Sequence, residues 1–146
     1  MKKFLSMFAI VAAMFAVVGC EKNDEVVLAE NLPREVTTFV QTHFPRVEIL
    51  NVIKDYSGRQ AYDFEIRLDD GTRLEISKGG EWKDVENYKK GVPSSIIPAE
   101  ILAYVADNHP EAIVISIDRE RGFEVGLNVG VDLYFDQSGN FSRYDY

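Results

Sequence analysis

Residues 62–76 read YDFEIRLDDGTRLEI, and apolar and polar side chains alternate along them on both sides of an Asp-Gly pair. A period of two places the apolar side chains on one face of a β-strand. Asp70-Gly71 is typical of a tight hairpin turn. The stretch therefore predicts two strands, at about 60–68 and 72–77, of a half-buried antiparallel meander.

The second half of the chain carries the same kind of alternation. Residues 123–136 alternate apolar and polar side chains and contain a turn signal near 128–130. Gly79-Gly80 and Ser138-Gly139 each predict a further hairpin. The remaining strands are predicted at 47–55, 82–86, 112–119, 123–128, 131–136 and 141–145.

Prolines bracket two segments of equal length, 33–45 and 98–110. Proline is favoured in the first turn of a helix and disfavoured inside it. The brackets therefore predict helices over about 33–44 and 98–109.

The two halves match each other, with LPREV at 32–36 and IPAEI at 97–101. This correspondence predicts an α+β fold built as a tandem repeat, in which each unit has one helix and an antiparallel meander of about four strands. The helices should pack on the sheets, and the units should associate through their sheets. The predicted units are 32–86 and 97–146, joined by a connector at 87–96.

The N-terminus has the features of a secretory leader. Lys2 and Lys3 precede an apolar run from 4 to 18. This run is shorter than the ~20 residues that a membrane-spanning helix needs. We therefore predict a signal peptide over residues 1–19.

The leader ends in Val17-Val18-Gly19, directly before Cys20, and these four residues resemble the lipobox of bacterial lipoproteins. The resemblance implies that Cys20 is lipidated and that the chain is held on a membrane through this anchor, followed by a flexible acidic tether over 20–31. The alternative is an ordinary secreted protein with a chance cysteine at this place. The expected location is the bacterial outer membrane, facing the periplasm, and the acidic run at 21–25 leaves the cell surface open.

Composition excludes several classes of function. The 146 residues include 24 acidic and 16 basic side chains, for a net charge of −8. The predicted leader holds two basic and no acidic residues, so its removal leaves a net charge of −10. An acidic protein lacks the attraction that phosphate backbones require, so we expect no nucleic-acid partner. With its one cysteine acylated, the chain would have no thiol for disulfides, metal binding or nucleophilic catalysis.

A family resemblance is carried by motifs in both halves. The first half has Pro33, Phe44-Pro45, Ile49, YDFEI (62–66), Asp70-Gly71, LEI (74–76), GEW (80–82) and Val85. The second half has Pro98, Pro110, FEV (123–125), FD (135–136) and GNF (139–141). Over about 32–146 the chain resembles the PepSY-like, β-lactamase-inhibitor-like (BLIP-like) family of bacterial envelope lipoproteins.

The resemblance implies an envelope protein of α+β fold, in a family with no established enzymatic activity. Related folds act by covering another protein. The chain lacks the cysteines that close the loops of the true β-lactamase inhibitors. The resemblance therefore assigns a role in β-lactamase inhibition to no residue of this chain.

No recognisable catalytic or metal motif is present in the sequence. His43 and His109 do not occupy equivalent positions in the two halves, which favours ordinary helix-end histidines over a duplicated site. The sequence has no serine-hydrolase elbow, Gly-rich phosphate loop or metalloprotease helix. We therefore predict no catalytic residue, no metal site and no cofactor.

Acidic side chains have two interpretations. Asp69-Asp70-Gly71 and residues 136–140 offer oxygens of the kind that calcium prefers. Their spacing fails the EF-hand pattern, and their composition favours hairpin turns. Asp63 and Glu65 could form a carboxylate pair, but the arginines that alternate with them favour a solvated charged surface.

Aromatic side chains are the remaining candidates. Four of them are predicted to lie in the core: Tyr62, Trp82, Phe123 and Phe141. Tyr134 falls with Glu124 and Asp132 on the polar face, where a tyrosine suits a recognition surface. Tyr88, Tyr144 and Tyr146 could extend that surface, and scattered surface tyrosines are the alternative.

These observations predict a non-enzymatic, envelope-anchored module that binds an envelope protein or peptide, with inhibition as one form of that binding. The alternative is a periplasmic module that binds a small molecule, a glycan or an ion. An enzyme is the third class, which a deep pocket with perturbed titratable groups would favour.

Overall fold

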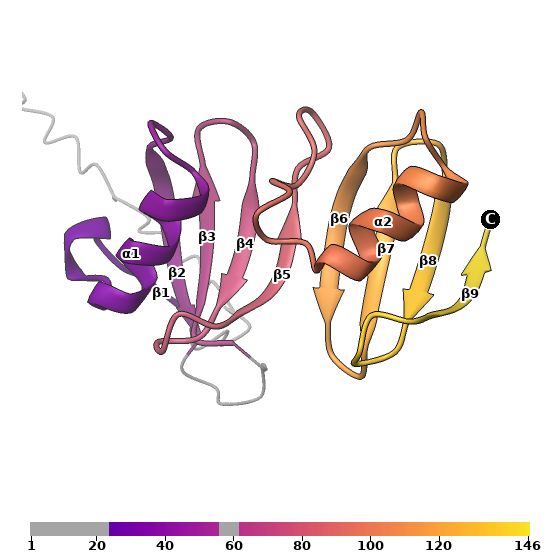
Figure 1. The fold of residues 1–146 in the computed structure, drawn as a ribbon. Helices are drawn as coiled ribbons and strands as arrows, with labels where there is room; N and C mark the ends of the chain where they lie inside the picture. The colour runs from indigo at the N-terminus through magenta and orange to yellow at the C-terminus, as the bar shows by residue number, and fades with distance from the viewer. Residues whose placement is uncertain (1–23, 56–61) are drawn as a thin grey trace, which may run out of the picture.

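The computed structural model describes residues 24–55 and 62–146, and nine strands in this part of the chain form one antiparallel sheet (Figure 1). The strands cross the sheet in sequence order, from β1 at one edge to β9 at the other. Their bounds are β1 Asp24–Val26, β2 Ile49–Asp55, β3 Phe64–Leu68, β4 Arg73–Ile76, β5 Trp82–Glu86, β6 Val114–Arg119, β7 Phe123–Leu127, β8 Val131–Phe135 and β9 Phe141–Asp145.

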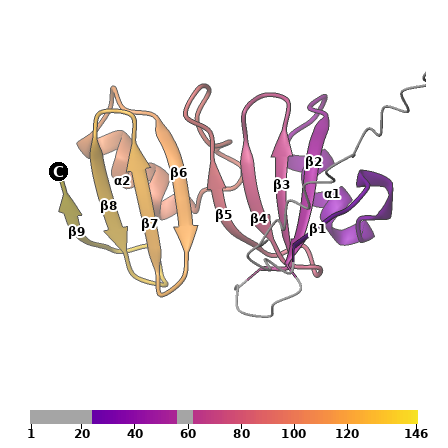
Figure 2. The ribbon, with the colours of Figure 1, turned by 180° about the vertical axis from the view of Figure 1, so that it is seen from behind.

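Two ten-residue helices, α1 (Arg34–His43) and α2 (Ala99–Asn108), lie where the proline pairs predict them. Pro33 and Pro98 directly precede them in extended conformation. A short 3-10 helix, η1 (Ala29–Asn31), leads into α1. Both helices cover the same face of the sheet, and Figure 2 shows the opposite face with no helix across it. We call this opposite face the open face.

The core fills the space between the two helices and the covered face of the sheet. Alternate residues of the strands from β2 to β8 point into it, which is the consequence of the period-two pattern. Buried apolar side chains from the helices are Val36 and Val40 of α1 and Ile101 and Val105 of α2. Those from the sheet include Val52, Phe64, Ile66, Leu68, Leu74, Ile76, Trp82, Val85, Val114, Ile117, Val125, Leu127, Val131, Leu133 and Phe135.

The predicted α+β architecture, a tandem repeat of helix-plus-meander units, is wrong. The structure is mostly β, with a single nine-stranded sheet. β5 pairs directly with β6, through Asp84–Asp118, Val85–Ile117 and Glu86–Ser116. Val85 and Ile117 are fully buried at this seam. Pairing β5 with β6 satisfies the backbone groups of two edges that separate sheets would leave open, and it makes the apolar core continuous.

The predicted flexible tether also needs correction for residues 24–31. β1 pairs with β2, the Val27 amide donates to the Val52 carbonyl at 2.9 Å, and the Val27 side chain packs against the core. These contacts fix the segment because they bury an apolar side chain and pair its backbone. The predicted signal peptide and Cys20 lie outside the described residues.

The predicted core aromatics divide in the structure. Trp82 is buried, whereas Phe123 and Phe141 are half-buried and pack against the core. The prediction for Tyr62 is wrong, since this half-buried tyrosine is not part of the core cluster. Burial raises the pKa of its hydroxyl to about 12, and the charges of Glu75 and Glu65 act in the same direction. β3 begins only at Phe64, so the strand alternation does not extend to Tyr62.

The turn after β5 depends on one buried amide, Asn87. Its Oδ1 accepts from the backbone N–H groups of Lys89 (3.0 Å) and Lys90 (2.9 Å), and its Nδ2 donates to Thr72 Oγ1 at 2.9 Å. Asn87→Ala would leave these partners unsatisfied and is expected to lower the free energy of unfolding by about 2 kcal/mol. Urea denaturation measures this loss. The control Asn108→Ala, at an exposed amide, should cost within about 0.5 kcal/mol, and equal losses would contradict the assigned role.

Candidate functional site: the open face of the sheet

The open face is lined by the polar residues that alternate with the core residues. Strand register places Glu65, Glu75, Asp84, Asp118, Glu124, Tyr134 and Arg143 in one row across the sheet. The next row holds Arg67, Arg73, Glu86, Ser116, Gly126, Asp132 and Asp145. Carboxylates outnumber cations in these two rows, so the face has an acidic character.

Arg73 lies among four carboxylates. Its guanidinium is 2.8 Å from Asp84, 3.4 Å from Glu65 and 3.7 Å from Glu86, and it also pairs with Glu75. Burial disfavours the charged guanidinium, but the carboxylates of Glu75, Glu65 and Glu86 outweigh it and raise the pKa of Arg73. One cation therefore holds together side chains from three neighbouring strands.

Asp84 is the most buried of these carboxylates. Burial raises the pKa of its carboxyl to about 7, and the charges of Glu86 and Glu75 act in the same direction, while Arg73 opposes them. Across the β5–β6 seam Asp84 faces Asp118, whose carboxylate lies 3.6 Å from Lys83 Nζ. The seam thus concentrates negative charge that Arg73 and Lys83 neutralise only in part.

The raised pKa of Asp84 has a defined effect on stability. Because its folded-state pKa lies above the unfolded value near 4, the contribution of Asp84 is favourable at low pH and is lost as pH rises to about 7. Asp84→Asn should therefore reduce the stability difference between pH 5 and pH 8 by about 2 kcal/mol, as measured by urea denaturation. Asp107→Asn, on the exposed side of α2, is the matched control, because it removes a carboxylate and leaves Asp84 in place. An unchanged pH dependence in Asp84→Asn would contradict this assignment.

A cavity of about 360 Å³ opens over the seam. Its lining consists of Asp84, Glu86, Tyr88, Ser116, Asp118, Glu124 and Asp132. Ser116 in this lining faces Gly126 across the β6–β7 pair, where a Cβ at Gly126 would lie 2.3 Å from Ser116 Oγ, so this pair has no room for a larger residue at position 126. The cavity presents carboxylate oxygens from four strands to one ligand, which suits a cationic group.

The predicted aromatic site residues separate between the two faces of the sheet. Tyr88 lines the acidic cavity and is 67% exposed. Tyr134 lies on the open face, with the Arg143 guanidinium 3.9 Å above its ring. Tyr144 lies opposite the buried Leu133 and therefore points to the helix side, where Tyr146 packs on it. Tyr88 and Tyr134 thus share the open face, but Tyr134 does not line the acidic cavity, and Tyr144 and Tyr146 lie on the other side of the sheet.

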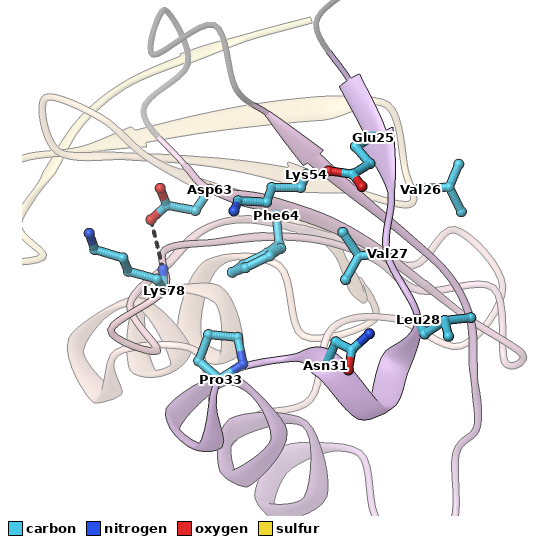
Figure 3. A pocket seen from close by; sticks show the side chains of 10 residues that line it. All are labelled: Glu25, Val26, Val27, Leu28, Asn31, Pro33, Lys54, Asp63, Phe64 and Lys78. Carbon is cyan, nitrogen blue, oxygen red and sulfur yellow. Dashed lines mark hydrogen bonds between the residues drawn. The ribbon is translucent and has the colours of Figure 1, made fainter.

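A second pocket, of about 560 Å³, lies beside β1 and the start of α1 (Figure 3). Its lining residues are Glu25, Val26, Val27, Leu28, Asn31, Pro33, Lys54, Asp63, Phe64 and Lys78. Phe64 forms an apolar surface inside it, and the amine of Lys78 stands at its rim, beyond Asp63. The carboxylate of Asp63 accepts from the Lys78 backbone N–H at 2.7 Å. The pocket is lined by both acidic and basic side chains around an apolar surface, so its lining does not favour one class of ligand.

The histidines and the acidic turns have structural partners. His43 Nδ1 lies 2.8 Å from Ser95 Oγ, and burial lowers the pKa of this imidazole. His109 directly follows α2, with its ring centroid 6.5 Å from that of Tyr104. The Asp136 carboxylate accepts hydrogen bonds from the backbone N–H groups of Ser138 and Asn140, so it holds the hairpin turn. Among the described residues, no group of three or more His, Cys, Asp or Glu side chains is arranged to hold a metal ion.

Sequence comparison now places the fold in a family. The family model described as "Putative beta-lactamase-inhibitor-like, PepSY-like" matches residues 62–143. This chain belongs to the PepSY-like family. The match covers the strands from β3 to β8 and the first three residues of β9, which contribute all residues of the two rows of the open face except Asp145. Among curated proteins, no sequence matches this PepSY-like chain.

Three solved structures of similar proteins come from Bacteroides. A "putative calcium-regulated periplasmic protein" of Bacteroides thetaiotaomicron is 28% identical, with a TM-score of 0.77 over 85% of this chain and 98% of that one. A "putative periplasmic protein of unknown function" of Bacteroides vulgatus is 29% identical, with a TM-score of 0.74 over 84% and 99%. Another Bacteroides vulgatus periplasmic protein, of the DUF2874 family, is 29% identical, with a TM-score of 0.76 over 88% and 100%.

The comparisons support a location in the bacterial envelope, because all three similar structures are described as periplasmic. The family is described as inhibitor-like, and none of these descriptions indicates a catalytic activity. In the described part of this PepSY-like chain, no helix is long and apolar enough to cross a membrane.

Proposed function

We propose that this PepSY-like protein is a non-enzymatic binding module of the envelope, whose open face engages a protein or peptide with exposed basic groups. The observation that carries this proposal is the acidic cavity over the β5–β6 seam, where Asp84, Asp118 and Asp132 converge beside the exposed Tyr88. Inhibition of an enzyme is one form that such binding can take.

The charge of the open face and the exposed ring of Tyr88 both favour a basic partner. A broad acidic face raises the rate of encounter with cations and suppresses binding of acidic proteins and nucleic acids. Tyr88 adds an exposed aromatic ring of the kind that supplies binding energy at interfaces. A cation that enters the cavity also relieves the repulsion among carboxylates that Arg73 only partly neutralises.

An oligolysine peptide tests the electrostatic part of the proposal. Isothermal titration at low salt should detect binding to the full chain, and the double variant Glu124→Gln/Asp132→Asn should weaken it at least tenfold. The matched control Asp107→Asn/Glu111→Gln removes the same charge at exposed positions on and after α2. Equal weakening by both double variants would contradict a site on the open face.

Calcium is a second candidate ligand, favoured by the carboxylate lining of the cavity and by the similar structure described as calcium-regulated. Calcium takes six to eight oxygen ligands, so the carboxylates would have to move together around the ion. Thermal unfolding with calcium or magnesium measures this, since a ligand of the folded state raises its stability. A calcium-specific rise in melting temperature that disappears in Asp84→Asn/Asp118→Asn would support calcium. No rise at millimolar calcium would exclude it.

We further propose that Cys20 carries the lipid that anchors the protein, most simply in the outer membrane facing the periplasm. The support is the lipobox-like sequence before Cys20 and the periplasmic description of similar structures. Labelled fatty acid should enter the wild type and not Cys20→Ser. Wild-type protein that is unlabelled and free in the medium would overturn the anchor.

A further inference from the structure

β9 ends the sheet with one edge unpaired. Its inner edge pairs with β8, and Figure 1 shows no element of the described chain along its outer edge. An outer edge presents backbone N–H and C=O groups that can pair with another strand. The opposite edge of the sheet is formed by β1, which has only three residues. β9 is therefore the longer of the two strands available for pairing.

The helix-side surface of β9 is an exposed aromatic row. Tyr104 stacks on Phe141 with ring centroids 4.4 Å apart, Phe141 lies 6.1 Å from Tyr144, and Tyr144 lies 5.2 Å from Tyr146. Exposure increases along β9 and past its end, to 51% for Tyr144 and 92% for Tyr146. The aromatic side chains thus extend from the core along β9, and no element of the described chain covers Tyr144 and Tyr146.

The open-face side of β9 carries opposite charges two residues apart. Arg143 and Asp145 flank Tyr144, and their side chains are each 62% exposed. If two β9 strands pair antiparallel about Tyr144, Arg143 of each copy faces Asp145 of the other. Opposite charges at facing positions stabilise strand pairing, and like charges destabilise it.

Other registers lose this complementarity. Centring the pair on Arg143 places two arginines opposite each other, and centring it on Asp145 places two aspartates opposite each other. A parallel in-register pair aligns like charges at both positions. A centre at Tyr144 also brings the tyrosines of both copies together on the helix side.

We propose that two copies of this chain pair β9 to β9, antiparallel about Tyr144, and so join their sheets into one. The association is weak, because each tyrosine buries at most about 150–250 Å² and the total stays well below the ~1,200 Å² of a standard interface. The dimer therefore forms only at high local concentration. It leaves the acidic cavity over the β5–β6 seam free.

Charge exchange tests the register. Sedimentation equilibrium of the full chain, in a density-matched neutral detergent, should show a monomer–dimer equilibrium for the wild type. Arg143→Asp or Asp145→Arg alone should weaken dimerisation at least tenfold, and the double variant should restore it. The control Glu124→Gln/Asp132→Asn should dimerise like the wild type, so the result is independent of binding at the open face. A wild type that stays monomeric, or a double variant as weak as the singles, would overturn the proposal.

Cross-linking gives a second test that does not depend on the charges. At the centre of the pair the two Tyr144 positions face each other, within the reach of a disulfide. The full chain with Cys20→Ser and Tyr144→Cys should form a disulfide dimer under mild oxidation, and the same chain with Tyr88→Cys should not. Equal cross-linking at both positions would indicate random collision and contradict the proposed pair.

Discussion

Replacing Arg73 with methionine is expected to lower the free energy of unfolding by about 3 kcal/mol at neutral pH. Arg73 contacts the carboxylates of Glu65, Glu75, Asp84 and Glu86, and its side chain is only 25% exposed. Methionine keeps the apolar stem but leaves these half-buried charges to repel one another. Urea denaturation near pH 7.5 measures the loss.

The pH dependence of this loss separates charge from packing. Below its raised pKa Asp84 binds a proton and no longer needs the cation, so the cost of Arg73→Met should shrink as pH falls. Arg67→Met is the matched control, because Arg67 is 56% exposed and its ion pair with Glu65 should contribute less than about 1 kcal/mol. An equal cost for both variants would contradict the central role of Arg73.

Ile117→Ala is expected to cost about 3 kcal/mol and to destabilise the whole chain in one transition. Ile117 is fully buried and faces Val85 across the β5–β6 seam. A cavity at this point weakens the contact through which the two halves of the sheet share one core. Thermal unfolding followed by circular dichroism should show a single transition at lower temperature.

Hydrogen exchange shows whether Ile117→Ala destabilises both halves of the sheet. Amides of β3 and β4 should lose protection together with those of β7 and β8, because a continuous sheet unfolds as one cooperative unit. The control Val129→Ala, at a 56% exposed turn position, should change stability by less than about 0.5 kcal/mol. Two separate transitions, or a loss confined to one half, would contradict a single cooperative sheet.

Local structure could be predicted from the sequence because local signals determine it. Pro33 and Pro98 precede the helices, and Gly71 adopts the positive φ of 93° that the Asp-Gly turn requires. The alternation of apolar side chains identified the strands from β2 to β9 to within a few residues. Each of these signals lies inside the element that it defines.

Pairing between the halves could not be predicted in the same way. Alternation shows which face of β5 and β6 is apolar, but not which strand lies beside which, so the seam and the single sheet were missed. β1 was missed because its three residues lie in an acidic segment with the composition of a tether. The acidic cavity depends on the seam, so its convergence of Asp84, Asp118 and Asp132 was missed as well.

The aromatic candidates show the same limit. Tyr134 was placed correctly on the polar face with Glu124, because both lie in regular strands. Tyr144 follows an irregularity in the β8–β9 pairing, which shifts the alternation and places it on the helix side. Irregular strand pairing depends on tertiary structure, and no local pattern in the sequence predicts it here.

The central claim, that the open face is the binding surface, is tested most directly by photo-cross-linking in living cells. A photoreactive amino acid at Glu124 samples the open face, and the same residue at Asp107 samples α2 on the covered side. We expect a discrete adduct with one envelope protein or peptide from Glu124, weakened by Asp132→Asn, and none from Asp107. Adducts from Asp107 alone, or none from Glu124, would contradict the account.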